Sequence, residues 1–183
     1  MNIGLDIMGG DYAPDAAVAG AIEAHKAINN DHQFILIGDE EKGRAICQDY
    51  NYDPDAFTWV HASQVITMGD FPAKAFSKKP ESSISKGYML LHKGKIDVLA
   101  SAGNTGAMLV GAMYTIKPVP GVIRPAISAI LPRPEGNNGI ILDVGLNPDS
   151  KPDVLYQYGI LGSEYAKRIL EIESPRVAIL SIG

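Results

Sequence analysis

Cysteine is almost missing from this sequence, since Cys47 is the only one in 183 residues. A single thiol excludes a disulfide within the chain and a cysteine-rich zinc site. Such sparse use is typical of proteins in a reducing compartment, so we expect a cytoplasmic location. Cys47 lies in a segment of helical character, 42–50, where we expect a small helix residue and not a nucleophile.

Long hydrophobic runs and an excess of positive charge are also missing. No apolar run approaches the roughly 20 residues that span a bilayer, and no basic leader opens the chain, so we expect neither a spanning helix nor a signal peptide. Any membrane association would be peripheral. The 16 Lys and Arg residues are outnumbered by 21 Asp and Glu residues, for a net charge of -5. Nucleic acid is therefore not an expected partner, and an anionic ligand would have to be held locally.

Several well-known catalytic motifs do not occur. The chain has no G-x-G-x-x-G dinucleotide fingerprint, no P-loop, no H-E-x-x-H metal motif and no G-x-S-x-G nucleophile elbow. Its four histidines show no paired metal-ligand spacing. We therefore predict no metal, no bound cofactor and no covalent nucleophile.

Short apolar runs rich in Val, Ile and Leu do recur, and segments of helical periodicity separate them. The predicted strands are residues 3–7, 34–37, 57–60, 96–100, 127–131, 140–144 and 177–182. The predicted helices are residues 14–28, 82–93, 105–114 and 152–170. This alternation predicts an α/β fold, with a mainly parallel sheet and helices on both faces. The last strand has no helix after it, so we expect the chain to stop before the fold is complete.

Ligands of such sheets gather beyond the carboxyl ends of the strands, which gives the residues there extra weight. The first strand runs into Asp6-Ile-Met-Gly-Gly10-Asp11, a carboxylate followed by a flexible turn that lets the backbone approach a ligand. The alternative is a tight turn in which Asp11 lies near a helix N-terminus.

A second strand end, in residues 97–108, carries a loop of small residues from Gly103 to Gly106 and a helix that begins near Thr105. Backbone N–H groups and the helix dipole would then point at one place, as an anion site requires. Asn104 adds a neutral donor, although an Asn at this position can equally serve only as an N-cap.

Three further stretches offer charge and amide groups. Arg124 precedes one predicted strand, Asp143 lies at the end of the next, Asn147 follows it, and Lys151 comes shortly after. Each also has a plain alternative, because surface cations are usually solvated and Asp143 can cap a turn. In the loop 78–83, Lys78 and Lys79 lie next to hydroxyl groups that could cap the following helix. A phosphate could bind to this loop, but a solvated loop is an equal alternative.

Taken together, these motifs resemble the bacterial phosphate acyltransferases of phospholipid synthesis. The similar stretches occur in family order: Leu5-Asp-Ile-Met-Gly-Gly-Asp11-Tyr-Ala-Pro14, Ile37-Gly-Asp-Glu40, Ser101-Ala-Gly-Asn-Thr-Gly-Ala107, Arg124-Pro-Ala126, Leu142-Asp-Val-Gly-Leu-Asn147, Lys151-Pro152 and Pro175-Arg-Val-Ala-Ile-Leu-Ser-Ile-Gly183. Two positions depart from the family. Ser77 stands where an arginine is frequent, which weakens the case for phosphate binding by that loop, and Leu146 stands where an alanine is usual, which we interpret as a packing change.

The resemblance implies a three-layer α/β/α fold of the isocitrate and isopropylmalate dehydrogenase type. It also implies transfer of a fatty acyl group from acyl carrier protein to inorganic phosphate, giving acyl phosphate. Residues 1–183 would be the N-terminal part of the catalytic domain. The remainder would supply further site residues and apolar helices for homodimer and peripheral membrane contact at the inner face of the cell membrane.

Our hypothesis for the site has a catalytic and a binding group. The catalytic group is Asn104, Asp6, Asp143 and Asn147, and the phosphate- or substrate-binding group is Gly10, Asp11, Gly103, Thr105, Gly106, Arg124, Lys151 and Lys79. Three alternatives stay open: phosphotransacetylase-like chemistry on coenzyme A thioesters, an oxidoreductase of the isopropylmalate dehydrogenase type, and a non-catalytic acyl carrier or regulatory binding module.

Overall fold

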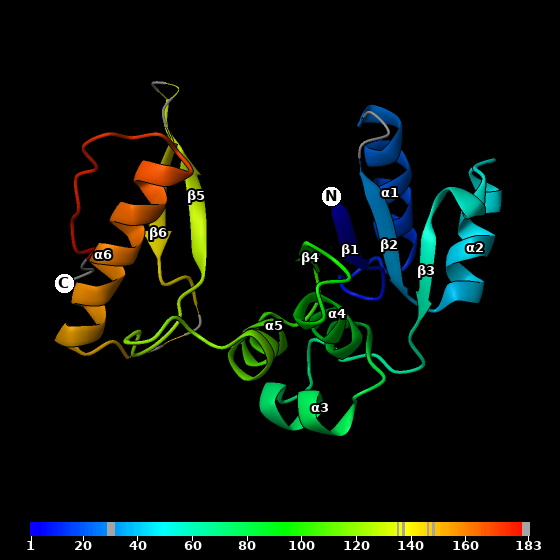
Figure 1. Cartoon of the computed structure of the whole chain (residues 1–183), viewed down its shortest axis with the longest axis horizontal. Helices are drawn as coiled ribbons and strands as arrows, with labels where there is room; N and C mark the ends of the chain where they lie inside the picture. The colour runs from blue at the N-terminus through cyan, green and yellow to red at the C-terminus, as the bar shows by residue number, and fades with distance from the viewer. Residues whose placement is uncertain (29–31, 135, 137, 146, 148, 181–183) are drawn as a thin grey trace. The chain divides into compact units, whose positions relative to one another are not determined.

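The structure, a computed structural model, describes residues 1–28, 32–134, 136, 138–145, 147 and 149–180. The chain divides into two compact units, Met1–Lys117 and Pro118–Gly183. Figure 1 labels the helices and strands of both units. We describe each unit by itself.

The first unit is built on a parallel sheet of four strands in the order β3-β2-β1-β4. Its central strand β1 pairs with β2 on one side and with β4 on the other, so that Leu5 lies between Leu36 and Ala100. The four strands confirm the parallel sheet predicted from the apolar runs. Their bounds are β1 Asn2–Asp6, β2 Gln33–Gly38, β3 Thr58–His61 and β4 Val98–Ala100.

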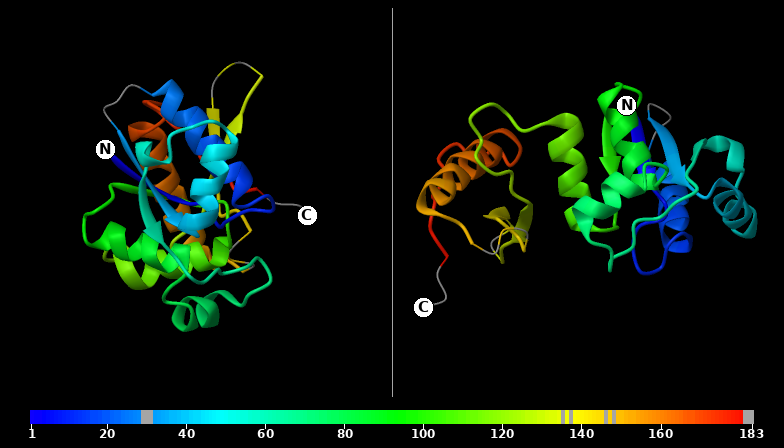
Figure 2. Two further views of the ribbon diagram at one scale, coloured as in Figure 1. Left: turned by 90° about the vertical axis from the view of Figure 1, so that its right-hand side faces the viewer. Right: turned by 90° about the horizontal axis from the view of Figure 1, so that it is seen from below.

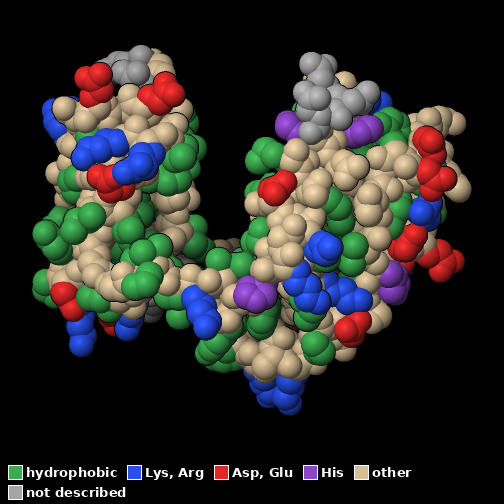
Figure 3. Space-filling model, in the orientation of Figure 1, with side chains coloured by type: hydrophobic (Ala, Val, Ile, Leu, Met, Phe, Trp, Pro, Cys, Tyr) green, Lys and Arg blue, Asp and Glu red, His purple; other side chains and the backbone are tan. Residues whose placement is uncertain are grey.

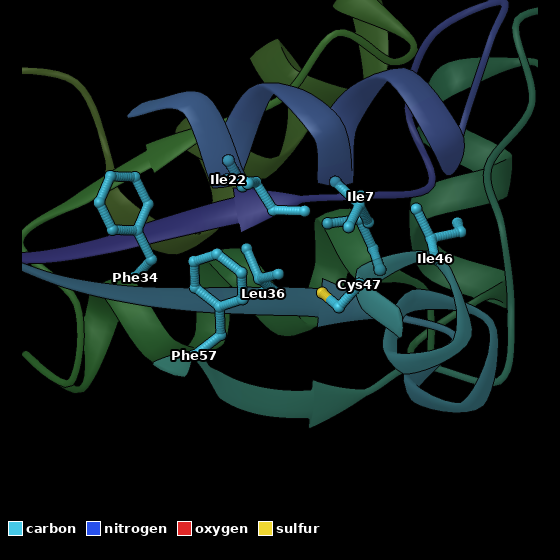
Figure 4. Packing of buried hydrophobic residues seen from close by; sticks show 9 residues of the cluster. Ile7, Ile22, Phe34, Leu36, Ile46, Cys47 and Phe57 are labelled. Carbon is cyan, nitrogen blue, oxygen red and sulfur yellow. The ribbon is translucent and has the colours of Figure 1, made fainter. Parts of the chain in front are cut away.

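Helices cover both faces of this sheet, as the sequence predicted. Phe34 and Leu36 of β2 face the core under α1 (Asp15–Ala27) and α2 (Glu40–Asp49), which also contains the buried Cys47. The intervening Ile35 and Ile37 pack against α4 (Ser83–His92) on the opposite face. Figures 2 and 4 show this layering and the packing around Leu36. Because both faces of β2 are buried, the strand is a continuous apolar run.

The remaining helices of the first unit pack around α4. They are α3 (Pro72–Lys78) and α5 (Thr105–Gly111), which a π-helical turn at Ala112–Ile116 extends. A short 3₁₀ turn also occurs at Pro54–Ala56. Buried residues from the three helices and the loop before α3 form one cluster: Ile66, Ala75, Ile84, Tyr88 and Ala107.

The predicted helices correspond to α1, α4, α5 with its extension, and α6 (Pro152–Arg168). The helical segment around Cys47 is α2. The short helix α3 was not predicted. Among the residues that the structure describes, no helix combines the length and apolarity needed to cross a membrane.

The second unit corrects two expectations. Its strands β5 (Ser128–Pro132) and β6 (Asn138–Leu142) do not join the parallel sheet; they form an antiparallel pair that α6 contacts. The strand predicted at 177–182 is wrong over 177–180, where the chain has no regular structure and Ile179 and Leu180 are exposed. An apolar run becomes a strand only where a partner strand accepts its hydrogen bonds, and periodicity does not reveal the partner. Residues 181–182 and Leu146 lie outside the described residues.

Shortening Leu36 to alanine should lower the free energy of unfolding by about 2–5 kcal/mol, because it removes a core side chain from a fixed cavity. Leu36 lies on β2, and its side chain is fully buried against α1 and α2. Chemical denaturation of the complete protein measures the change. Gln33→Ala, at the exposed start of the same strand, is the control and should stay within about 0.5 kcal/mol. Equal losses in the two variants would contradict the assigned burial.

Candidate functional site

The strand order of the first unit places a topological switch point at the carboxyl ends of β1 and β4. The connection from β1 to β2 runs through α1 on one face, whereas β4 is reached through α4 on the opposite face. Connections that leave neighbouring parallel strands in opposite directions mark the place where such sheets bind ligands. The two loops at this point are those that the sequence singled out, 7–12 and 101–104.

A buried carboxylate ties the two loops together. Asp6 is only 2% exposed, and its Oδ1 accepts a hydrogen bond from the Met8 N–H at 2.9 Å. Its Oδ2 accepts one from the Ser101 hydroxyl at 2.7 Å, and the same Ser101 oxygen accepts from the Gly103 N–H at 3.0 Å. The catalytic role predicted for Asp6 stays a prediction. In the structure its hydrogen bonds hold the loops after β1 and β4 together. Ser101 was missed as a site residue, although it directly follows β4.

Two glycines bring the loops into backbone contact. A Cβ added to the buried Gly9 would lie 2.5 Å from the Gly103 nitrogen and 2.9 Å from Asp6 Oδ2. Gly10 has φ 101°, a left-handed conformation that glycine adopts without strain. Asp11, the next residue, is exposed. The turn thus needs both glycines, one for space and one for conformation.

Asn104 is the N-cap of α5, which is one of the two roles that the sequence allowed for it. It is 5% exposed, and its Oδ1 accepts from the Ala107 N–H at 2.9 Å. Its Nδ2 points at the carbonyl oxygens of Thr67 at 3.0 Å and Asp70 at 3.2 Å. The side-chain amide is therefore engaged at both ends, which suits a positioning residue better than an oxyanion donor.

The start of α5 keeps two backbone donors unused. The N–H of Ala107 goes to the Asn104 side chain and that of Met108 to the Asn104 carbonyl. No residue of the described part of the chain accepts from the N–H groups of Thr105 and Gly106. Unused donors at a helix start, with the positive end of the helix dipole, can bind an anion.

Lys79 is engaged in the loop that Asn104 holds. Its Nζ lies 2.6 Å from Asp70 Oδ2 and donates to the Val65 carbonyl at 2.8 Å. The hydrogen bond from Lys79, followed by that from the Thr67 N–H, holds the pKa of Asp70 below its usual range. The phosphate contact predicted for Lys79 stays a prediction, and in the structure its ammonium group is engaged by Asp70 and Val65. Asp70 was missed because its partner Lys79 lies nine residues away, on the other side of α3 in the sequence.

The second unit brings together Asp143, Asn147 and Tyr158. Asp143 accepts from the Ile127 N–H at 2.8 Å and from the Asn147 N–H at 2.6 Å. The Asn147 Nδ2 donates to the Tyr158 hydroxyl at 3.1 Å. Burial, and then the charge of Asp143, raise the pKa of Tyr158, so its hydroxyl stays protonated at neutral pH. Tyr158 was missed because it lies on the buried face of α6, where a core role is the usual one.

The predicted cations of this unit lie at its surface. Arg124 is exposed, and its Nη1 lies 3.5 Å from the Asp149 carbonyl; Lys151 is exposed at the N-cap position of α6. A cavity of about 450 Å³ within the unit has Asp143, Asn147 and Tyr158 in its wall. In the described residues, no three His, Cys, Asp or Glu side chains gather as metal ligands.

The sequence defines the class of protein. The family model described as "Fatty acid synthesis protein" matches residues 1–183. The chain belongs to this family.

Two curated relatives narrow the comparison. The chain is 43% identical over 183 residues to a protein of Dictyoglomus turgidum and 44% identical over 183 residues to one of Acetivibrio thermocellus. Both relatives carry the name phosphate acyltransferase. All of this chain is covered in each case, but only 54% and 53% of the relatives. The chain thus spans about half the length of the curated relatives it matches.

Two solved structures share the fold. A phosphotransacetylase from Streptococcus pyogenes superposes with a TM-score of 0.69 at 18% identity, over 94% of this chain and 55% of the other. The EutD phosphotransacetylase from Staphylococcus aureus superposes with a TM-score of 0.64 at 22% identity, over 91% of this chain and 52% of the other. At these identities the likeness concerns the fold.

Gly9→Ala should lower the stability of the complete protein by about 1–3 kcal/mol, because a Cβ there overlaps backbone that cannot move aside. Gly20→Ala is the matched control. Gly20 lies on the exposed side of α1 with open space around it, so the change should be neutral or stabilising by up to about 1 kcal/mol. Denaturant unfolding compares the two. Equal stability of both variants would contradict the close approach of Gly9 and Gly103.

Asp70→Asn should loosen the loop before α3 in a pH-dependent way. The folded pKa of Asp70 is lower than its unfolded value of about 3.9, so the ion pair stabilises the protein above that pH. This stabilisation is lost as pH falls through the folded pKa. The Tm difference between wild type and variant should therefore be constant from pH 7 to about pH 5 and shrink below about pH 4.

Asp11→Asn controls for this experiment, since no described residue pairs with the exposed Asp11 side chain. Its Tm should follow that of the wild type at each pH. A difference for Asp70→Asn that persists unchanged under acidic conditions would contradict the role of the charge.

Proposed function

We propose that the complete protein transfers a fatty acyl group from an acyl carrier protein thioester to inorganic phosphate, giving acyl phosphate for phospholipid synthesis. The family and the name of the curated relatives support acyl transfer to phosphate. The observation that carries the proposal is the pair of unused N–H donors at Thr105 and Gly106. They lie beside the carboxyl ends of β1 and β4, where a small anion can be held in an otherwise acidic chain.

Attack of phosphate on a thioester requires no nucleophilic side chain. A phosphate oxygen is already an anionic nucleophile near neutral pH, and it attacks the thioester carbonyl as the thiol leaves. The protein must position phosphate, offset its charge and donate to the oxyanion that develops on the carbonyl. Backbone donors in a rigid loop meet the first of these needs. In this reaction no side chain has to act as a nucleophile. Cys47 is buried, and desolvation raises the pKa of its thiol.

We assign each predicted residue a role on this basis. In the first unit, the phosphate loop consists of Gly103, Thr105 and Gly106. Gly10 approaches it from the loop after β1, and Asp11 is the exposed carboxylate at its rim. Asp6, Asn104 and Lys79 act through the loops that they hold. In the second unit, Arg124 and Lys151 stay predicted binding residues, and Asp143 and Asn147 stay predicted catalytic residues in the wall of that unit's cavity.

Several finer features belong to the same proposal. They are a three-layer architecture of the isocitrate and isopropylmalate dehydrogenase type for the complete domain, a homodimer, a cytoplasmic location, and peripheral membrane contact through residues that this chain does not contain.

One alternative donor has support from the fold. The two solved structures of similar fold are phosphotransacetylases, so a coenzyme A thioester is the second candidate substrate. Assays of the complete protein with long-chain acyl carrier protein and with acyl coenzyme A, each with and without phosphate, separate the two. We expect phosphate-dependent consumption of the acyl carrier protein thioester. Consumption of only the coenzyme A thioester would contradict this donor, and nicotinamide binding without acyl transfer would favour an oxidoreductase.

Thr105→Pro tests the backbone donor directly. Proline removes one N–H but is accepted at the first position of a helix, as Pro72 and Pro152 illustrate in α3 and α6. The preceding Asn104 has φ -62° and ψ 107°, a conformation allowed before proline. A hydrogen bond to a charged group contributes about 1.5–3 kcal/mol, so the KM for phosphate should rise about 10-fold or more.

Thr105→Ala is the matched control, because it removes the hydroxyl and keeps the N–H. Its KM for phosphate should stay near the wild-type value. If the two variants have the same KM, the Thr105 N–H does not hold phosphate.

A further inference from the structure

The short helix α3 presents a cationic and aromatic face next to the phosphate loop. Lys74 and Lys78 lie one turn apart on its exposed side, while Ala75 is buried against the α4–α5 cluster. Phe71, the residue at the N-cap of α3, is 74% exposed. We call Phe71, Lys74 and Lys78 the α3 face.

Stability of the helix does not explain this face. Like charges four residues apart slightly destabilise a helix, and an aromatic ring in water gains nothing from burial. No carboxylate of the described residues pairs with Lys74 or Lys78. By contrast, the nearby Lys79 and Lys86 are paired with Asp70 and Glu81.

The face is positive on an acidic chain. Between residues 72 and 95 the only carboxylate is Glu81, and the lysines are Lys74, Lys78, Lys79, Lys86, Lys93 and Lys95. The rest of the chain is correspondingly more acidic than its net charge of -5. Figure 3 shows Lys and Arg side chains over α4 and at the tip of α3, and acidic side chains toward α2. Such separation of charge steers a partner of opposite sign.

The α3 face is held rigidly at the phosphate loop. A Cβ on Gly106 would overlap Pro72, the first residue of α3, so the start of α3 lies against the start of α5. The Asn104 amide and the Lys79–Asp70 pair fix the loop that leads into Phe71. The lysines are therefore fixed with respect to the N–H groups proposed to hold phosphate.

We propose that the α3 face is the docking surface for the acyl carrier protein, whose acidic surface contacts Lys74 and Lys78 while Phe71 packs beside the thioester-bearing arm. This rests on the proposed function. A carrier protein bound here delivers its thioester to the neighbouring loop. Charge complementarity at an exposed rim acts mainly on the capture of the partner and makes it dependent on salt.

The test compares two double charge reversals in the complete protein, Lys74→Glu with Lys78→Glu and, as the matched control, Lys93→Glu with Lys95→Glu. Lys93 and Lys95 are also exposed and unpaired in the described part of the chain, and they follow the far end of α4. Each variant is assayed with long-chain acyl carrier protein and with acyl coenzyme A as a small thioester. The Lys74→Arg, Lys78→Arg variant keeps the charge.

We expect the α3 reversal to raise the KM for acyl carrier protein about 10-fold or more at low salt, with little change in kcat. Turnover of the small thioester and the KM for phosphate should stay at wild-type values, and added salt should shrink the difference. The control reversal and the arginine variant should resemble the wild type.

Three results would overturn the inference. One is an unchanged KM for acyl carrier protein. Another is an equal loss with both thioesters, which would indicate that α3 is covered or needed for folding in the complete protein. The third is a loss confined to binding of anionic lipid vesicles, which would make the face a membrane contact. Failure of the proposed function is distinct, because the wild type would then form no acyl phosphate from the acyl carrier protein thioester.

Discussion

The hydrogen bond between the Ser101 hydroxyl and the buried Asp6 carboxylate is the contact on which the arrangement of the two loops after β1 and β4 depends. A carboxylate this deeply buried is tolerated only when its oxygens are hydrogen-bonded, and Asp6 obtains its partners from both loops. The requirement works in both directions. Burial of Asp6 demands that the loops meet, and the meeting of the loops puts Gly9 against Gly103. The geometry at the carboxyl ends of β1 and β4 is thus fixed by the electrostatics of one residue.

A second set of contacts extends this rigidity outward. Asn104 caps α5 with its oxygen and holds the loop before α3 with its nitrogen, while Lys79 binds the same loop through Asp70. These side chains are fully engaged with the protein, yet they leave the N–H groups of Thr105 and Gly106 without an acceptor in the described structure. In this arrangement polar side chains position the backbone, and the backbone supplies the N–H groups of the proposed anion site. An acidic chain can then hold an anion without a cluster of cations around it.

The sequence predicted the parts of the fold that depend on local patterns. Strands buried on both faces, such as β2, are continuous apolar runs, and α1 and α4 carry clear helical signals. The run at 177–180 has the same appearance but no regular structure, because strand formation also needs a partner that a pattern does not reveal. The helix α3 was missed since it is short and rich in exposed lysine. Antiparallel pairing of β5 with β6 is likewise a property of two segments together.

The same reasoning explains which site residues were found. Rules about strand ends locate Asp6, Gly103 and Asn104, because position along one strand is enough. They do not reveal what each side chain does. The sequence alone leaves Asn104 as either a helix cap or a donor to a ligand. The carbonyl groups that engage its Nδ2 belong to Thr67 and Asp70, which lie 37 and 34 positions away in the sequence. Asp70 and Tyr158 carry no local signal, since each gains its role from a partner on another element.

The distribution of charge in the first unit follows from these constraints. A phosphate site made of backbone N–H groups carries little net charge, so it has weak power to attract an acidic partner from a distance. Attraction over that range requires full charges, and they must lie beside the site without neutralising it from within. The lysines of α3, which have no partner among the described residues, meet both conditions, because α3 lies against the start of α5 while their side chains face solvent. In the proposed mechanism, backbone groups thus hold the anion, and separate side-chain charges attract its co-substrate.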